Sequence, residues 1–319
     1  MPARTMRFWT GACLISLAAA SSPALAQGAQ NHLRIVNKCA TPVWIQQNGL
    51  PDQKAVIEIA AGKAHDYVIA PKGVPSTRFW PKLNCDKDGN NCAVGQSSNP
   101  CPTDGGCAPP VDSKLEATWG CLTDPASCAK NPSNGQPLDN NTWFNASLVD
   151  GFTVPFDVTV ESADTSSGCQ SPATCPVINY KNACPTSVDL STDGAFPAYA
   201  KQNLQVIGPS KAVTGCFSAC GKMTFSKFYG GHQLSPNDPR AAYYCCVAVN
   251  GTNPIPGGNP ATSAGCNAGP APKTAYVSYV HKACDSSVYG FAYDDAKGLR
   301  VCGGQTSLTF TLCPATPAK

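Results

Sequence analysis

Hydrophobic and polar positions alternate in short runs near both ends of the chain and again in its middle. The runs at 33–36, 43–45 and 56–59 are rich in β-branched residues, and 154–160 and 308–312 show the same alternation. Short runs of this kind, separated by Asn, Gly and Pro, are typical of half-buried β-strands with turns between them. The pattern predicts a mainly β fold, a β-sandwich in which strands from both ends of the chain belong to one sheet system.

Cys-rich regions interrupt these runs. Residues 84–110 carry four Cys among Asn, Asp, Gly and Pro, and residues 120–141 form a second polar stretch with its own Cys pair. Both are predicted to be stapled loops rather than core. Residues 169–284 are also dense in Cys. Within them Cys216 and Cys220 are four residues apart, which predicts a helix with both sulfurs on one face.

The composition excludes several classes of protein. Charged residues make up 13% of the chain and hydrophobic residues 42%, which argues against intrinsic disorder and against a coiled coil. Beyond residue 26 the chain has 21 basic and 20 acidic residues. A surface this close to neutral has no electrostatic footprint for nucleic acid and no polybasic membrane anchor.

The first residues have the features of a secretory signal. Two Arg precede an apolar run over 11–20, which is too short to span a bilayer. The tripeptide at 24–26 has the A-x-A form of a cleavage site. We therefore expect a signal peptide over 1–26, a mature chain from Gln27, and a secreted protein in an extracellular or periplasmic space. The alternative is an uncleaved membrane anchor.

The cysteine count predicts a disulfide framework. The chain has 19 Cys, of which Cys13 falls in the predicted signal peptide. The remaining 18, in an exported chain, allow up to nine bonds. Zinc is the alternative, but it needs closely spaced Cys or His ligands. The four His, at 32, 65, 232 and 281, are scattered. We expect no metal and no cofactor.

Four stretches of the sequence resemble the thaumatin-like protein family, of the pathogenesis-related group 5 type. They are IVNKCATPVW at 35–44, FWPKLNC at 79–85, SLVDGFTVP at 147–155, and the C-terminal end from 289 to 314. Sixteen of the 18 mature Cys also follow the family's order. The resemblance covers about residues 33 to 314.

The resemblance implies a disulfide pairing that spacing alone leaves open. Cys121 and Cys128 are additional to the family's set and would bond each other within an insertion. The full implied set is Cys39–Cys313, Cys85–Cys92, Cys101–Cys107, Cys121–Cys128, Cys169–Cys302, Cys175–Cys284, Cys184–Cys216, Cys220–Cys245 and Cys246–Cys266.

The resemblance also implies the arrangement of the mature domain, 27–319. The β-sandwich would use 27–83, 111–168 and 285–319. A small stapled loop domain would use 84–110, and a disulfide-rich lobe with short helices would use 169–284. The family has an acidic cleft between sandwich and lobe.

Three acidic positions of that cleft can be carried over to this chain. The resemblance places its Glu at Glu116 and two of its Asp at Asp150 and Asp294, with Asp295 beside the latter. Each also has an ordinary interpretation. Asp150-Gly151 is a hairpin-turn signal, Asp294-Asp295 suits a solvated turn, and Glu116 alone is a surface carboxylate.

Two cleft positions depart from the family's pattern. Asn145 stands where a third Asp is expected, and Ala108 stands where an Arg is expected. Asn can bind hydroxyls but cannot ionise, and without the Arg a cation that would balance the carboxylates is missing. Glycoside hydrolysis needs one carboxyl as acid and another as base or nucleophile. Glu116 with Asp150 or Asp294 is the candidate catalytic pair, although the third Asp and the Arg of the family's cleft are missing.

Aromatic side chains offer a second way to bind sugars, by stacking on the ring faces. Phe228-Tyr229, followed by two Gly, is predicted to be an exposed aromatic loop. Together with Asn145 and Asp295 these two residues are the candidate ligand-binding positions.

Three functional hypotheses follow, in order of preference. The first is a binder of cell-wall polysaccharide, with β-1,3-glucan implied by the resemblance and an antifungal or defence role. The second is a weak endo-β-1,3-glucanase that uses Glu116. The third is a non-catalytic extracellular scaffold or protein inhibitor. We expect a monomer with a polysaccharide or protein partner, no nucleic acid and no membrane span.

Overall fold

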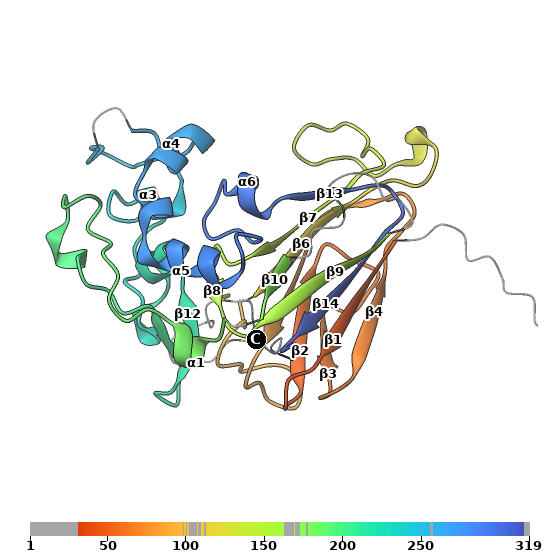
Figure 1. Cartoon of the computed structure of the whole chain (residues 1–319), viewed down its shortest axis with the longest axis horizontal. Coiled ribbons are helices and arrows are strands. Elements are labelled where there is room, and N and C mark those ends of the chain that lie inside the picture. Colours follow the sequence, from red (N-terminus) through yellow and green to blue (C-terminus); the bar gives the residue numbers. More distant parts are fainter. Residues whose placement is uncertain are drawn as a thin grey trace, which may run out of the picture.

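The computed structural model describes residues 31–315, apart from 98, 100, 102–106, 108, 109, 112, 163–168, 170–172, 177, 256 and 257. The predicted signal peptide and Ala108 lie outside the described residues. Strands dominate and the helices are short, so the mainly β fold is confirmed. Figure 1 shows strands packed together on one side of the molecule and a lobe of short helices on the other.

The first sheet brings the two ends of the chain together. Its order is β10-β9-β14-β1-β4. β1 and β14 run parallel, with Leu33 opposite Leu308, and the Cys39–Cys313 bond joins the residues that follow them. The prediction that both ends share one sheet system is confirmed. The strands are Ala173–Cys175 (β10), Phe156–Ser162 (β9), Thr306–Leu312 (β14), His32–Asn37 (β1) and Ala64–Val68 (β4).

The second sheet has six strands in the order β13-β7-β6-β5-β2-β3. Alternate side chains of its central strands are buried in the core, including Phe79, Leu115 and Phe144. The side chains between them point to the opposite, outer face, because successive residues of a strand alternate in direction. The strands are Arg300–Cys302 (β13), Thr142–Ser147 (β7), Lys114–Trp119 (β6), Val74–Lys82 (β5), Val43–Asn48 (β2) and Val56–Ile59 (β3).

The lobe contains a small sheet and short helices (Figure 1). The sheet has the order β11-β12-β8, formed by Gln205–Ile207, Val213–Phe217 and Gly151–Phe152. The α-helices of the chain are Tyr180–Ala183 (α1), Ala219–Thr224 (α2), Ala242–Cys245 (α3), Ser263–Ala268 (α4), Ala275–Ala283 (α5) and Asp295–Gly298 (α6). Single 3₁₀ turns cover Pro125–Ser127 (η1), Pro197–Tyr199 (η2), Lys227–Tyr229 (η3) and Ala271–Lys273 (η4).

Hydroxyl side chains decide where three of the lobe helices begin. Ser218, Thr262 and Thr274 are the N-caps of α2, α4 and α5, and each side-chain oxygen accepts a hydrogen bond from the backbone three residues later. Such caps satisfy a backbone donor that the first helical turn leaves unpaired.

The predicted helix through Cys216 and Cys220 is wrong in its first half. Cys216 lies in β12 and only Cys220 lies in α2. The helix starts after its cap at Ser218, so the four-residue spacing does not report a shared helical face. The two Cys bond different partners, Cys184 and Cys245.

Nine disulfides join cysteines of the described residues, and they are the same nine pairs that the resemblance implies. The additional bond, Cys121–Cys128, staples the long β6–β7 connection at 120–141. This connection packs on the turn after β4, where Leu122 N donates to Pro71 O at 2.7 Å and Ala129 N to Lys72 O at 2.8 Å.

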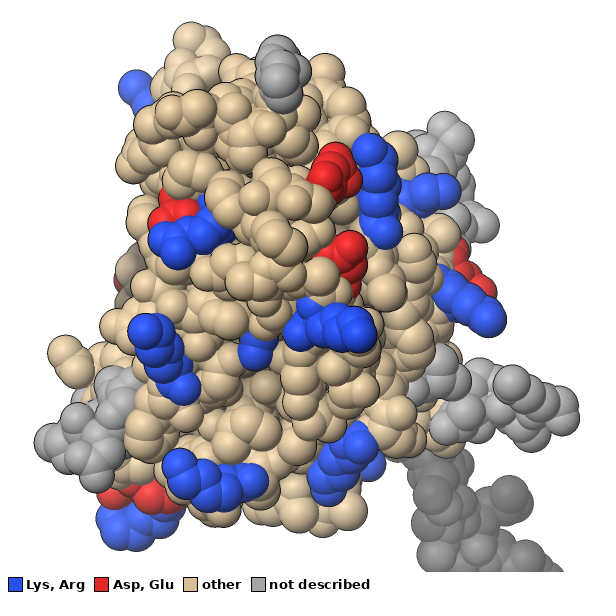
Figure 2. Space-filling model, turned by 90° about the vertical axis from the view of Figure 1, so that its left-hand side faces the viewer, with Lys and Arg blue, Asp and Glu red and all other residues tan. Residues whose placement is uncertain are grey.

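Charge is unevenly distributed between the two sides of the molecule. Residues 178–283 of the lobe carry eight Lys and Arg but three Asp. Figure 2 shows this side, with basic side chains spread over the surface and acidic ones fewer. The rest of the chain beyond residue 26 has an acidic excess. Within the described part of the chain, no helix is long and apolar enough to cross a membrane.

Candidate functional site

A row of polar side chains crosses the outer face of the six-stranded sheet. Asn145 of β7 lies opposite Glu116 of β6, and Glu116 lies opposite Arg78 of β5. Directly opposed residues of antiparallel strands point to the same face. The Arg78 Nε–Glu116 Oε1 distance is 2.9 Å, and Asn145 Nδ2 donates to Glu116 Oε2 at 3.1 Å. Asn48 of β2 continues the row beside Arg78.

A pocket of about 260 Å³ opens along this row. Trp143, two residues before Asn145, forms part of its wall, and Leu299, which directly follows α6, also lines it. The Trp143 side chain is 39% exposed, which is unusual for so large an aromatic. The pocket therefore combines a carboxylate, an amide, a guanidinium and an aromatic surface, all facing solvent.

The expectation that the carboxylate of Glu116 has no neighbouring cation is wrong, because Arg78 lies beside it. The resemblance placed the Arg position at Ala108, which lies outside the described residues. The structure instead brings Arg78 onto Glu116 from the neighbouring strand. Arg78 directly precedes the FWPKLNC stretch at 79–85 and alternates with buried Phe79, which is the sequence signal for its place on the outer face.

Asp150 belongs to the junction between sheet and lobe. Its Oδ2 is paired with Lys114 Nζ, and its carbonyl accepts from Ser218 N at 3.1 Å. The hairpin interpretation of Asp150-Gly151 is wrong, because β8 pairs with β12 of the lobe rather than with β7. Gly151 has φ +142°, and a Cβ there would lie 2.1 Å from the Cys216 carbonyl. The backbone therefore lies so close to the lobe at this position that only glycine fits.

Asp294 is a buried carboxylate, and one of its two oxygens accepts two hydrogen bonds. The residue is 5% exposed. Its Oδ2 accepts from His281 Nε2 at 2.6 Å and from Gly290 N at 2.9 Å. Asp295, the first residue of α6, is exposed instead, and its Oδ1 accepts from the Tyr289 hydroxyl.

Tyr289 connects these acids to the pocket. Its backbone pairs with the end of β7 through Ala146 and Leu148. Burial raises the pKa of its hydroxyl, and the bond to Asp295 and the negative charges of Asp295, Asp294 and Glu116 raise it further. All three acids therefore lie near one phenol. Asp150 is not among them; its charge acts on the pKa of Tyr276 in the lobe.

The structure thus separates the predicted site residues into two groups. Glu116 and Asn145 line the pocket, whereas Asp295 is exposed and accepts from the Tyr289 hydroxyl. Asp150 is held in an ion pair with Lys114, and Asp294 is held by hydrogen bonds from His281 and Gly290. Sequence reasoning missed Arg78 and Tyr289, whose roles depend on strand register and on a long-range contact.

The predicted aromatic loop at Phe228-Tyr229 does not face solvent as expected. Tyr229 is fully buried, and Phe228 is half-buried with the Lys211 Nζ 5.7 Å from its ring centroid. The prediction of an exposed pair is wrong because the chain after η3 returns along α2, where His232 N donates to Lys222 O at 2.9 Å and Leu234 N to Met223 O at 3.0 Å.

A larger hollow of about 740 Å³ lies at the opposite end of the six-stranded sheet. Trp44, Tyr180 and the Cys39–Cys313 bond contribute to its walls, and the predicted acidic residues do not. Among the described residues no cluster of three or more His, Cys, Asp or Glu could hold a metal ion.

These features define a disulfide-stapled, mainly β protein with a polar groove on a sheet face. The family model described as the thaumatin family matches residues 37–314. The chain belongs to the thaumatin family.

Two curated relatives illustrate the similarity. "Thaumatin-like protein 2" of Prunus persica is 26% identical over 280 residues, which cover 87% of this chain and 88% of the relative. "Glucan endo-1,3-beta-glucosidase" of Prunus avium is 28% identical over 245 residues, 74% of this chain and 71% of the relative. A solved GH family 64 laminaripentaose-producing β-1,3-glucanase from Paenibacillus barengoltzii covers 92% of this chain and 78% of its own, at 13% identity and a TM-score of 0.41. That structural likeness is too weak to bear on function.

Proposed function

We propose that this protein is secreted and binds a wall polysaccharide of the β-1,3-glucan type in the groove on the outer face of the six-stranded sheet. The single observation that carries this proposal is the row Asn145–Glu116–Arg78 beside the exposed ring of Trp143. A further role in defence against fungi would follow from binding their wall glucan.

The chemistry of the row suits a sugar chain. Carboxylate and amide oxygens accept hydrogen bonds from hydroxyls, and the amide and guanidinium donate to hydroxyl oxygens. An aromatic face packs on the C–H face of a pyranose. Strands lie about 4.8 Å apart, so the row presents polar groups at regular intervals across several strands. An extended polymer can contact them in succession, whereas a compact ligand cannot.

Binding is better supported than hydrolysis. A glycosidase needs one carboxyl that carries a proton and a second that acts as base or nucleophile. Glu116 already has Arg78 and Asn145 as partners. Asp150 is paired with Lys114, and Asp294 is buried against His281. Asp295 is the exposed acid left to act with Glu116, and it is engaged by Tyr289.

Weak hydrolysis is the second candidate, favoured by one comparison. The Prunus avium relative carries the name of a glucan endo-1,3-beta-glucosidase. If this chain shares that activity, Glu116 is the acid that we expect to be required.

One experiment separates the hypotheses. Purified mature protein is incubated with insoluble β-1,3-glucan, and with cellulose and xylan as controls, and the bound fraction is measured. Trp143→Ala and Asn145→Ala should each reduce binding. Val68→Ala is the matched control, because Val68 is also exposed but lies in β4 of the other sheet. It should bind like the wild type.

A parallel assay measures new reducing ends from soluble β-1,3-glucan. Product release that Glu116→Gln abolishes would make the protein a hydrolase and replace the binding proposal. Binding without release supports the proposal. Neither binding nor release would refute both and leave a scaffold or inhibitor, the third hypothesis.

A further inference from the structure

Cationic side chains gather around one histidine of the lobe. Burial lowers the pKa of His232, and the positive charges of Lys222, Lys227 and Arg240 lower it further. The three cations therefore lie near one imidazole. We call these four residues the cation cluster, and none of them lines either of the two pockets described above.

Side-chain contacts hold the imidazole of His232 in place. Its Nε2 lies 2.7 Å from Gln202 Oε1, and because an amide oxygen only accepts, Nε2 carries the proton of the neutral ring. The ring packs edge-on against Tyr199, with the centroids 4.9 Å apart, and the Tyr199 hydroxyl lies 3.5 Å from Arg240 Nη1. Within the described part of the chain, no group lies within hydrogen-bonding distance of Nδ1, which is the nitrogen left to take up a proton.

Lys222 is the unusual member of the cluster. The residue is only 8% exposed, and its ammonium donates to the Gly230 carbonyl. An ammonium has three donors, and none of the carboxylates that the structure describes lies within ion-pair distance of this one. Burial lowers the pKa of this group. Buried lysines are rare unless they are paired, so a counter-charge is expected here and the described residues do not supply it.

The acids of the lobe do not balance the cluster. Asp238 contacts it and pairs with Nε and Nη2 of Arg240. Asp189 and Asp193 act instead on the hydroxyl of Tyr244. With a neutral imidazole, three cations and one carboxylate leave a net charge of +2.

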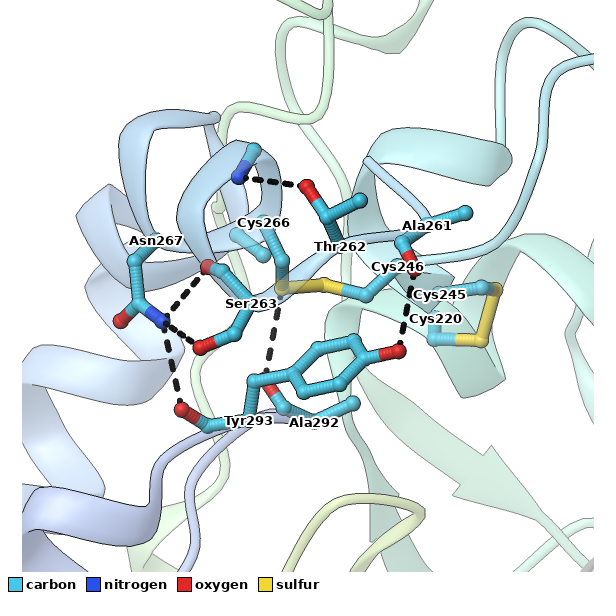
Figure 3. The surroundings of a disulfide bond; sticks show 12 residues. Cys220, Cys245, Cys246, Ala261, Thr262, Ser263, Cys266, Asn267, Ala292 and Tyr293 are labelled. Atoms are coloured by element: carbon cyan, nitrogen blue, oxygen red, sulfur yellow. Dashed lines mark hydrogen bonds between the residues drawn. A yellow bond between two sulfur atoms is a disulfide. The ribbon is translucent and has the colours of Figure 1, made fainter. Parts of the chain in front are cut away.

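Disulfide bonds fix the segments that carry these charges. Lys222 lies on α2, two residues after Cys220, and Cys220 is bonded to Cys245 of α3. Figure 3 shows this bond close to a second disulfide, which joins the end of α3 to α4. Arg240 lies two residues before α3. The bonds limit how far the like charges can separate, so the site is pre-organised for an anion.

We propose that the cation cluster binds a doubly charged tetrahedral oxyanion, a sulfate or phosphate group that is either free or carried by a saccharide. A dianion matches the net charge of +2, whereas a carboxylate matches only half of it. Protonation of Nδ1 adds a donor and a further positive charge. The inference goes beyond glucan binding and does not depend on it, because no residue of the cluster lines the pocket of the polar row.

The first test follows the imidazoles of the mature protein. Sulfate is the probe, because its charge stays constant over the pH range in which histidine titrates. NMR measures the titration of each His ring in sodium sulfate and in sodium chloride of equal ionic strength, and His232→Gln assigns the signal. We expect the pKa of His232 to be higher in sulfate, because the protonated ring should bind the anion about tenfold more tightly.

His65 is the internal control. Burial also lowers its pKa, but its charged neighbour is Asp66 rather than a cation. Its titration should be the same in both salts. An equal shift of His65 and His232 would be a general salt effect and would overturn the inference.

The second test is calorimetry of sulfate binding at about pH 6. Lys222 is buried, so the variant is Lys227→Ala, whose exposed side chain can be removed without disturbing the packing. We expect about fivefold weaker binding. Lys72→Ala removes the same charge from the exposed turn after β4 and should bind like the wild type. Equal affinity of Lys227→Ala and the wild type would refute the site.

Two further ligands identify the source of the anion. Tighter binding of glucose 6-sulfate than of sulfate supports a group carried by a saccharide, and the reverse supports the free ion. Acetate that binds as well as sulfate would overturn the assignment to a dianion. The insoluble-glucan assay of Lys227→Ala should match the wild type, so failure of this inference leaves the proposed function intact.

Discussion

Substitution of Asp294 tests whether this carboxylate stabilises the fold or contacts the ligand. Its buried Oδ2 accepts from both His281 Nε2 and Gly290 N. Asp294→Ala removes both bonds and leaves two donors without a partner. An unpaired buried donor costs about 1–3 kcal/mol. We therefore expect the free energy of unfolding to fall by about 3 kcal/mol.

Asp294→Asn is the matched variant. Both hydrogen bonds go to one oxygen, so the amide Oδ1 of Asn can take its place and keep them while the charge is lost. A hydrogen bond to a charged acceptor is stronger than one to a neutral acceptor, and we expect a loss of about 1 kcal/mol. Because Oδ2 faces His281 and Gly290, neither variant should change glucan binding by the folded protein.

Urea unfolding of the mature protein with its disulfides intact, followed by Trp fluorescence, measures the stability of both variants. The glucan pull-down measures binding in the same preparations. The reasoning is refuted if Asp294→Asn unfolds like the wild type but loses binding or product release. Asp294 would then contact the ligand, and its pairing with His281 would be incidental.

Three further changes test other parts of the structure. In Gly298→Ala the new Cβ would lie 2.1 Å from Tyr289 Cδ2 and 2.7 Å from its backbone N. The forced shift should cost about 1–3 kcal/mol in urea unfolding and weaken glucan binding, and an unchanged protein would contradict the packing. Burial and nearby cations hold the pKa of His232 below its ordinary value of 6.5. The unfolded chain therefore binds the proton first, and stability should fall as the pH drops below about 6.5. Urea unfolding at about pH 7.5 and about pH 5.5 should show a smaller difference for His232→Gln than for the wild type; an equal difference would exclude His232 as the cause. Replacing Cys121 and Cys128 by Ser opens a loop with a separation of 7 residues, which the loop-entropy model values at about 2.5 kcal/mol. Thermal unfolding should detect this loss, while unchanged glucan binding would confirm that the insertion lies outside the groove.

Several features of this protein follow from the sequence by itself. Period-two alternation predicts the mainly β fold, because it depends only on neighbouring residues of each strand. The count of Cys predicts the disulfide framework, and the resemblance adds its pairing. The same resemblance selects Glu116 and Asn145, which the structure places side by side on adjacent strands.

Only the tertiary structure decided how these groups are partnered. Arg78 reaches Glu116 because the β5–β6 register places them opposite each other, and one strand's pattern does not contain that register. Asp294 and Asp295 are chemically identical neighbours, yet Asp294 is buried against His281 and Gly290 while Asp295 is exposed. The exposure of aromatic side chains is likewise decided by contacts with other segments. Tyr229 is buried where the chain after η3 returns along α2, whereas Tyr293, bonded to Ala261 and to Asn267 of α4, is exposed. Local patterns determine which strands form, but burial and charge pairing depend on which strands and loops meet.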